Sequence, residues 1–223
     1  MTIHLLMLWL LFAPVVATLC VIVGEIASAE YIEQAVQKRP DFYSLWLTAV
    51  LTTLGNIWGI GLPLHAAIHY FVLQHCTSRA WYIAFPLMIV TQHVLFHLAH
   101  YAMHRWLYRI HKFHHQYNET VFPASGIAVT VSEFLFAYSL PVIIGLAIAR
   151  PAPPVLGCFL ALEYACTIYV HSGFLSSKQY KYAVTPAYHC AHHSTCPNSN
   201  LAAPMFTFPD LMFDTQTDKL KNC

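Results

Sequence analysis

The chain has 223 residues, of which 57 % are hydrophobic and 9 % are charged, and its mean hydropathy is +0.51. A soluble domain carries about 25 % charged residues, so this composition excludes an ordinary soluble protein and predicts a membrane protein. The net charge of +1 argues neither for nor against an acidic partner. The chain has no basic patch interleaved with aromatic residues, and we therefore expect no nucleic-acid partner.

Five apolar stretches predict helices that cross the bilayer, whose core needs about 20 helical residues. They are residues 3–23, 42–64, 80–100, 127–149 and 155–170. The first stretch lacks the basic start of a signal peptide, so we interpret it as an anchor. A proline-rich corner at 150–154 makes 127–170 a membrane hairpin. We expect an all-α, polytopic membrane protein with about four to five transmembrane helices.

The basic residues predict the orientation of these helices. If residues 100–122 face the cytosol, the hairpin returns the chain to the same side at His171. Nine of the eleven basic residues then lie in the cytosol, and only Arg79 and Arg150 lie opposite, which is the positive-inside pattern. The last five residues, KLKNC, resemble a dilysine retrieval signal for the endoplasmic reticulum. We therefore expect a multi-pass protein of that membrane with a cytosolic C-terminus.

Most of the histidines fall into boxes with the spacing of metal ligands. The boxes are an HxxxH, two HxxHH elements and a single histidine before the last of them, and they comprise His100, His104, His111, His114, His115, His171, His189, His192 and His193. Residues three or four apart share a helix face, so each box presents its imidazoles together. A single zinc or iron ion rarely takes more than three or four histidines, so this number suits two metal ions better than one.

The remaining histidines have simpler interpretations. An isolated histidine ordinarily packs or bonds a backbone carbonyl, and we interpret in this way a set consisting of His4, His65, His69, His75 and His93. His97 is either an extra ligand or a group that supports a ligand. Glu133 and Glu163 lie within apolar spans, where ionisable groups are usually functional or paired. Either carboxyl would orient a ligating histidine or form a simple hydrogen bond between helices.

Over residues 92–218 the boxes resemble, in order, the fatty acid hydroxylase/sterol desaturase superfamily of membrane di-iron oxidases. The matching segments are FHLAHYAMH (96–104), LYRIHKFHH (107–115), HSGF (171–174), YHCAHH (188–193), Asn200 and DLMFDT (210–215). The HSGF and HKFHHQ elements look most like the sterol-acting branch, which contains C-4 methylsterol oxidases, C-5 desaturases and cholesterol 25-hydroxylase. Tyr101, Thr130 and Asp214 depart from the family pattern, which has Arg, His and Gly there.

This resemblance implies a function and a ligand set. Two iron ions would bind the nine histidines named above, and the chain would use O₂ to hydroxylate, demethylate or desaturate a sterol or related lipid. No flavin, nicotinamide or haem motif is visible, so electrons would come from an external donor, for which cytochrome b5 or a reductase is the implied partner. Residues 80–223 would form a hydroxylase-like catalytic domain with its histidine boxes in a cytosolic cap, and residues 1–79 would form N-terminal membrane anchor helices.

Other functions remain open at this point. The chain would alternatively be a non-enzymatic membrane metal-binding or zinc-transport protein, hold zinc structurally, or hydroxylate a fatty acyl chain. A transporter needs ionisable residues in the middle of several helices, whereas these boxes gather at one membrane face. The sequence therefore favours the oxidase.

Overall fold

The computed structural model describes residues 3–71, 78–173 and 180–217 and consists there of helices with two isolated β-bridges, Tyr180–Ala183 and Ala183–Phe206. The helices that build the membrane-spanning part are α1 (Ile3–Ala27), α3 (Phe42–Leu54), the π-helix η1 (Gly55–Gly61), α4 (Leu62–Phe71), α5 (Trp81–Arg105), α7 (Val131–Glu133), the π-helix η5 (Phe134–Ser139), α8 (Leu140–Ala149) and α9 (Pro153–Val170). The others are α2 (Ala29–Lys38), α6 (Tyr108–His115), the 3₁₀ turns η3 (Asn118–Thr120) and η4 (Pro123–Ile127), α10 (Pro186–Ser194) and α11 (Phe208–Phe213). The predicted all-α class is confirmed.

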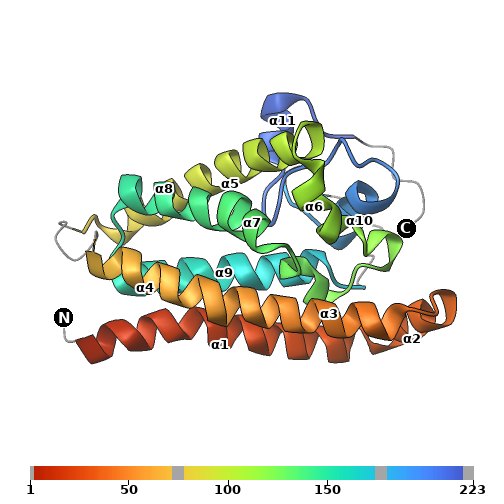
Figure 1. The fold of residues 1–223 in the computed structure, drawn as a ribbon. Coiled ribbons are helices and arrows are strands. Elements are labelled where there is room, and N and C mark those ends of the chain that lie inside the picture. The colour runs from red at the N-terminus through yellow and green to blue at the C-terminus, as the bar shows by residue number, and fades with distance from the viewer. Residues whose placement is uncertain (1–2, 72–77, 174–179, 218–223) are drawn as a thin grey trace.

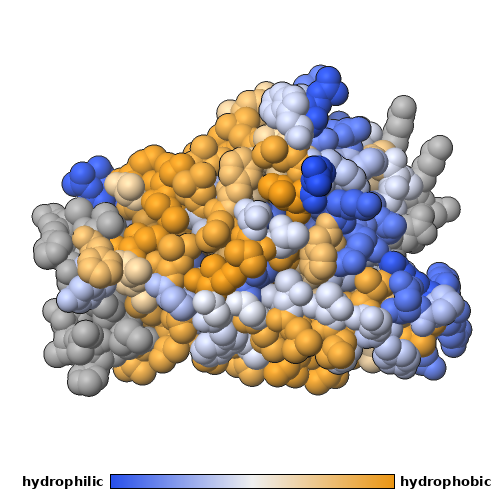
Figure 2. Space-filling view, in the orientation of Figure 1, coloured by the Kyte–Doolittle hydropathy of each residue, from blue (hydrophilic) through white to orange (hydrophobic). Residues whose placement is uncertain are grey.

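Five segments are long and apolar enough to cross a membrane, as predicted. They are Leu8–Ala27, Phe42–Ile68, Trp81–Arg105, Val131–Ala149 and Pro153–Val170. Figure 1 shows them running side by side, with α6, α10 and α11 gathered at one end. The protein is therefore a multi-pass membrane protein with a cap. Figure 2 shows the matching surface, which is hydrophobic over the spanning helices and hydrophilic at the cap end.

The boundaries of two predicted segments differ from the structure. The hairpin helix begins at Val131, because Pro123–Ile127 forms the 3₁₀ turn η4 and Thr130 caps the following helix. The residues between the first two predicted spans, 24–41, are largely helical, because α1 continues to Ala27 and α2 follows from Ala29. Both differences lie at segment ends, where hydropathy carries little information.

Close helix packing holds the spanning part together, as expected where lipid supplies no hydrophobic drive between helices. α1 packs along α9, and α5 packs along α8. Gly157 of α9 permits the first contact, because a Cβ there would lie 2.7 Å from the backbone oxygen of Trp9. The anchor helix α1 thereby shares one apolar core with α9, in which Leu10 and Leu156 are buried. The division of the chain at residue 79 stays a prediction.

The segment between α6 and α7 is tied to α3 and η1 by buried side chains. Thr53 Oγ1 donates to the carbonyl of Ala124 at 2.6 Å. Asn56 Nδ2 donates to the carbonyls of Ile127 at 2.9 Å and Val129 at 3.0 Å. These bonds give buried backbone carbonyls of this segment side-chain donors. They fix the approach of the chain to α7, which carries Glu133 of the site described below.

The structure shows which end of the spanning part holds the two bases, Arg79 and Arg150, that the predicted topology separates from the others. The backbone N–H of Arg79 donates to the carbonyl of Arg150 at 3.0 Å, so these two bases lie together at the end away from the cap. α5 reaches the cap end at Arg105, as the topology requires. Lys178 and the dilysine pattern of residues 219–223 lie outside the described residues. Which end faces the cytosol stays a prediction.

Candidate metal centre

The nine box histidines converge from four parts of the chain, which are α5, α6, the end of α9 and α10, into two adjacent groups. The first group is His100, His104, His111, His115 and His192, and the second is His114, His171, His189 and His193. Within each group one ring nitrogen from every residue lies within 4.8 Å of all the others. The ring centroids of His115 and His193, one from each group, are 4.6 Å apart, so the groups adjoin. The sequence predicted these residues as ligands, and the structure brings all of them together.

Each HxxHH box contributes to both groups in the same manner. In α6, His111 and His115 belong to the first group and His114 to the second. In α10, His189 and His193 belong to the second group and His192 belongs to the first. Residues four apart point about 40° from each other around a helix, whereas consecutive residues point about 100° apart. The i, i+4 pair therefore faces one group, and the i+3 histidine reaches the other.

α5 does not continue through the second box. It ends at Arg105, and after Trp106 and Leu107 a separate helix α6 begins at Tyr108. His104 and His111 therefore lie on two different helices. The break lets α6 fold back, which brings the His104 and His111 ring centroids to 4.7 Å.

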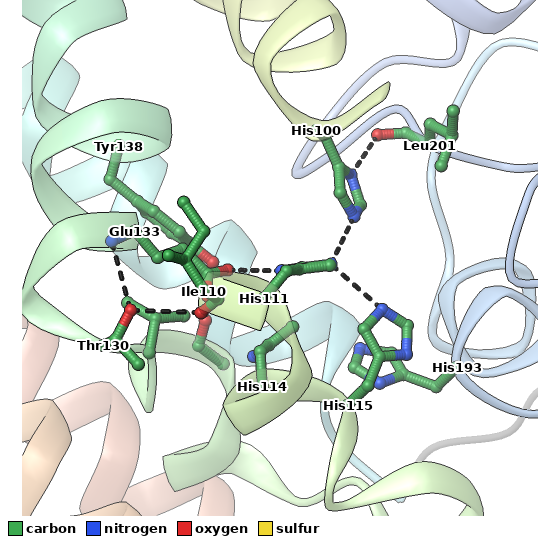
Figure 3. Close-up of polar contacts among 12 residues, drawn as sticks. His100, Ile110, His111, His114, His115, Thr130, Glu133, Tyr138, His193 and Leu201 are labelled. Atoms are coloured by element: carbon green, nitrogen blue, oxygen red, sulfur yellow. Dashed lines mark hydrogen bonds and ion pairs between the residues drawn. The ribbon is translucent and has the colours of Figure 1, made fainter. Parts of the chain in front are cut away.

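Hydrogen bonds at Nδ1 fix the ring orientations in the first group. His100 Nδ1 donates to the carbonyl of Leu201 at 2.8 Å, and His111 Nδ1 donates to Glu133 Oε1 at 2.6 Å (Figure 3). Each neutral ring then carries a lone pair on Nε2. These Nε2 atoms lie 3.0 Å apart, and His115 Nε2 lies 3.0 Å from His111 Nε2. Lone pairs that face each other repel, and a shared cation removes this repulsion.

The second group has the same arrangement. His171 Nδ1 donates to the carbonyl of Thr167 at 2.8 Å, which leaves its Nε2 as an acceptor. That Nε2 lies 2.9 Å from His189 Nε2 and 3.4 Å from His114 Nε2. His193 Nε2 lies 3.1 Å from His189 Nε2. All of these donors are neutral nitrogens that point at one volume, which fits a bound metal ion.

Burial keeps the cap histidines neutral. It lowers the pKa of His171 to about 4, and burial together with the neighbouring His114 lowers the pKa of His115 to about 2. The pKa values of the others in the cap are held well below the ordinary value, mainly by burial, and these residues are His111, His114, His189, His192 and His193. Nε2 of His192 has no hydrogen-bond partner in the described chain. Neutral imidazole is the form that binds a metal.

Of the two carboxyls in apolar spans, Glu133 contacts a box histidine. Thr130 positions it, because Thr130 Oγ1 accepts the backbone N–H of Glu133 at 3.2 Å and donates to the carbonyl of Ile110 at 3.1 Å. The threonine that replaces a family histidine thus caps α7 and joins it to α6, as Figure 3 shows. Glu163 lies 3.8 Å from His93 Nδ1 and contacts no box histidine of the described chain.

Asp210 supports the site in a role that the sequence analysis did not assign. Its carboxylate accepts the backbone N–H groups of Leu201 at 2.9 Å and Ala202 at 2.7 Å, and the hydroxyl of Tyr188 at 2.7 Å. It thereby holds the segment whose Leu201 carbonyl orients His100. The only sequence signal was its place in the DLMFDT segment.

The other histidines lie outside both groups. His97 Nδ1 lies 3.5 Å from Asp210 Oδ1, and its ring stacks on Phe213 at 5.0 Å, which makes it a neighbour of the supporting network. His65 and His93 are buried elsewhere. The side chains of His4 and His69, and all of His75, lie outside the described part of the chain.

Two further positions have backbone constraints that favour glycine. A Cβ on Gly126 would lie 2.9 Å from the carbonyl of Thr167 and 3.1 Å from His171 Nδ1, so only glycine fits against this ligand. Asp214, which replaces the family glycine, has φ 53° in the left-handed region, where Gly is favoured and Asp is tolerated. Tyr101, the third departure, has 41 % of its surface exposed.

A narrow, mostly apolar cavity leads from the histidines into the spanning helices. Imidazoles of both groups line its upper end, including His100, His111 and His171. Phe134, Leu160 and other apolar side chains line its walls. An apolar molecule in this cavity would reach the metal centre from within the membrane.

Comparisons with known proteins agree with this site. The sequence model of the family described as fatty acid hydroxylase matches residues 85–215, which is more than half of the chain and spans all nine histidines. No curated protein and no solved structure matches the chain. The chain therefore belongs to the fatty acid hydroxylase family, within the fatty acid hydroxylase/sterol desaturase superfamily.

Proposed function

We propose that the protein is an O₂-dependent membrane oxidase that holds two iron ions and hydroxylates, demethylates or desaturates a sterol or related lipid. The observation that carries this proposal is the pair of histidine groups with converging Nε2 lone pairs at the mouth of an apolar cavity. Family membership supports an oxidoreductase. Bound iron would supply the activation of O₂ and the removal of hydrogen from an unactivated C–H bond.

The chain itself supplies orientation and a dry environment. Glu133 and the Leu201 carbonyl hold His111 and His100 with Nε2 directed into the first group. The spanning helices admit a lipid from the bilayer and exclude water from the reacting carbon. Hydroxylation converts one C–H bond, one O₂, two electrons and two protons into C–OH and water. The electrons require an external donor, and we propose cytochrome b5 or a related reductase in the endoplasmic reticulum membrane.

The zinc-transport alternative is disfavoured by the position of the groups. All nine rings lie in the cap or at its junction with the spanning helices, whereas a transporter needs coordinating residues along its path through the bilayer. A fatty acyl hydroxylase fits the same metal centre. The substrate panel below therefore includes both lipid classes.

The experiment expresses the chain in a sterol-auxotrophic host with an electron donor and measures O₂ consumption and lipid products from a sterol and fatty acyl panel. The wild type should yield an oxidised sterol, and His192→Ala should yield none, because the first group loses a ligand. His93→Phe is the matched control, since it removes an imidazole of α5 that lies in neither group. Equal product from wild type and His192→Ala would contradict the oxidase, and product from the acyl lipids alone would contradict the sterol.

A further inference from the structure

Besides the box histidines, the lining of the cavity includes polar side chains from four spanning segments. These are His65 of α4, Gln92 of α5, Ser139 of η5 and Glu163 of α9. Each is at least nine-tenths buried, with between 1 % and 6 % of its surface exposed. Polar groups in the middle of spanning helices are costly and usually functional. Their convergence on one cavity points to a common role.

One polar atom of each of these residues has no hydrogen-bond partner in the part of the chain that the structure describes. The atoms are His65 Nε2, Gln92 Oε1, Ser139 Oγ and Glu163 Oε1. His93 Nδ1 lies 3.8 Å from Glu163 Oε1, but that nitrogen bonds the carbonyl of Ile89 at 2.9 Å. A buried polar group without a partner costs free energy, so these atoms need a ligand.

The depth of this polar cluster can be read along the helices. Gln92 precedes His100 by eight residues in α5, and Glu163 precedes His171 by eight residues at the end of α9. At a rise of 1.5 Å per residue, the backbone positions of Gln92 and Glu163 lie about 12 Å along their helices from those of His100 and His171. Side chains and contact distances take up part of this length, and a bound molecule spans the remainder. With carbon–carbon bonds of about 1.5 Å, several bonds therefore separate its two contact points.

We propose that His65, Gln92, Ser139 and Glu163 form a subsite that hydrogen-bonds an uncharged hydroxyl or carbonyl oxygen of the lipid substrate. This proposal rests on the proposed function for its chemistry, because it places the oxidised carbon several bonds from that oxygen. A free fatty acid fits poorly, since its carboxylate would face the carboxyl of Glu163 and no Lys or Arg lines the cavity. A sterol alcohol matches this chemistry, with its hydroxyl at these polar side chains and its remote hydrocarbon toward the histidines.

The test compares two probes in nanodiscs: cholesterol and the same hydrocarbon without its hydroxyl group. Dissociation constants are measured with the metal-loaded wild type, Glu163→Leu and Gln92→Leu. Wild type should bind the alcohol at least about tenfold more tightly, as expected for a buried hydrogen bond to an otherwise unpaired group. Both variants should lose this preference. Tyr169→Phe is the control, because it removes a hydroxyl from the 48 % exposed Tyr169 of α9.

Stability and metal content keep the test interpretable. Replacing an unpartnered polar group by an apolar one should not lower the melting temperature, and the metal content should stay that of wild type. Ser139→Ala, a smaller change, should weaken the preference if the leucine variants do not fold. Wild type without a preference for the alcohol, or binding neither probe, would overturn the subsite, and so would an unchanged preference in the folded variants. These binding results do not depend on turnover, so failure of the oxidase proposal shows separately in the absence of product.

Discussion

Glu133 Oε1 accepts a 2.6 Å hydrogen bond from Nδ1 of His111, and both side chains are almost completely buried. The bond joins α7 of the membrane hairpin to α6 of the cap. It leaves Nε2 of His111 as a lone-pair donor at the centre of the first group. A residue of the spanning part thereby sets the direction of a ligand outside it.

Removing this carboxylate should weaken metal binding without removing a ligand. We predict that Glu133→Ala lowers metal affinity by about 10- to 100-fold, as is typical when the partner of a ligating histidine is lost. Chelator competition measures this affinity. Glu30→Gln, an exposed change on α2, serves as control. Equal affinity of Glu133→Ala and wild type would show that the bond does not orient His111.

Asp210 should matter for stability as well as for the site. Asp210→Ala leaves the N–H groups of Leu201 and Ala202 and the Tyr188 hydroxyl without their acceptor. We predict a loss of about 3 kcal/mol or more in the free energy of unfolding, and about 1 kcal/mol for Tyr188→Phe. Denaturant unfolding in detergent measures both. Asp41→Asn, at a side chain 60 % exposed, should change little. Equal stability of Asp210→Ala and wild type contradicts this assignment.

The left-handed backbone at Asp214 gives a separate test. With φ 53°, Asp214→Gly should be neutral or slightly stabilising, whereas Asp214→Val should cost about 1–2 kcal/mol through contact of Cβ with the backbone. The melting temperatures of the two variants give the comparison. A valine variant as stable as the glycine variant would rule out this conformation.

Gly126→Ala should damage the second group selectively. The new methyl group would meet the Thr167 carbonyl and His171 Nδ1, so His171 must shift from its ligand position. We predict that metal content falls from two ions per chain toward one. Gly55→Ala is the matched control, since its Cβ meets nothing within 4 Å. Full metal content in Gly126→Ala would contradict the close packing at His171.

The metal-free protein should become less stable in acid. Burial lowers the pKa of His171 from 6.5 to about 4, so between these pH values the unfolded chain binds a proton that the folded chain does not. The other cap histidines shift in the same direction. Unfolding free energy should therefore be constant above about pH 7 and fall as the pH drops toward 4. Stability that rises over this range would contradict neutral, buried rings.

The sequence was sufficient for the spans and for the set of histidines that converge, because hydropathy and i, i+3, i+4 spacing report local periodicity. It did not predict how the two HxxHH boxes divide between the groups. That division depends on how α6 and α10 face each other, and on the break after Arg105 that let α6 turn back. The supporting bond of Asp210 to Tyr188 joins residues 22 positions apart through irregular chain, where no periodicity exists to detect it.

The most direct test of this account is the metal-to-protein ratio of chain purified from iron-supplied cells. The account predicts two iron atoms per wild-type chain and no more than one in either His192→Ala or His189→Ala, since each variant removes a ligand from a different group. Wild type without iron, or both variants retaining two atoms, would contradict it.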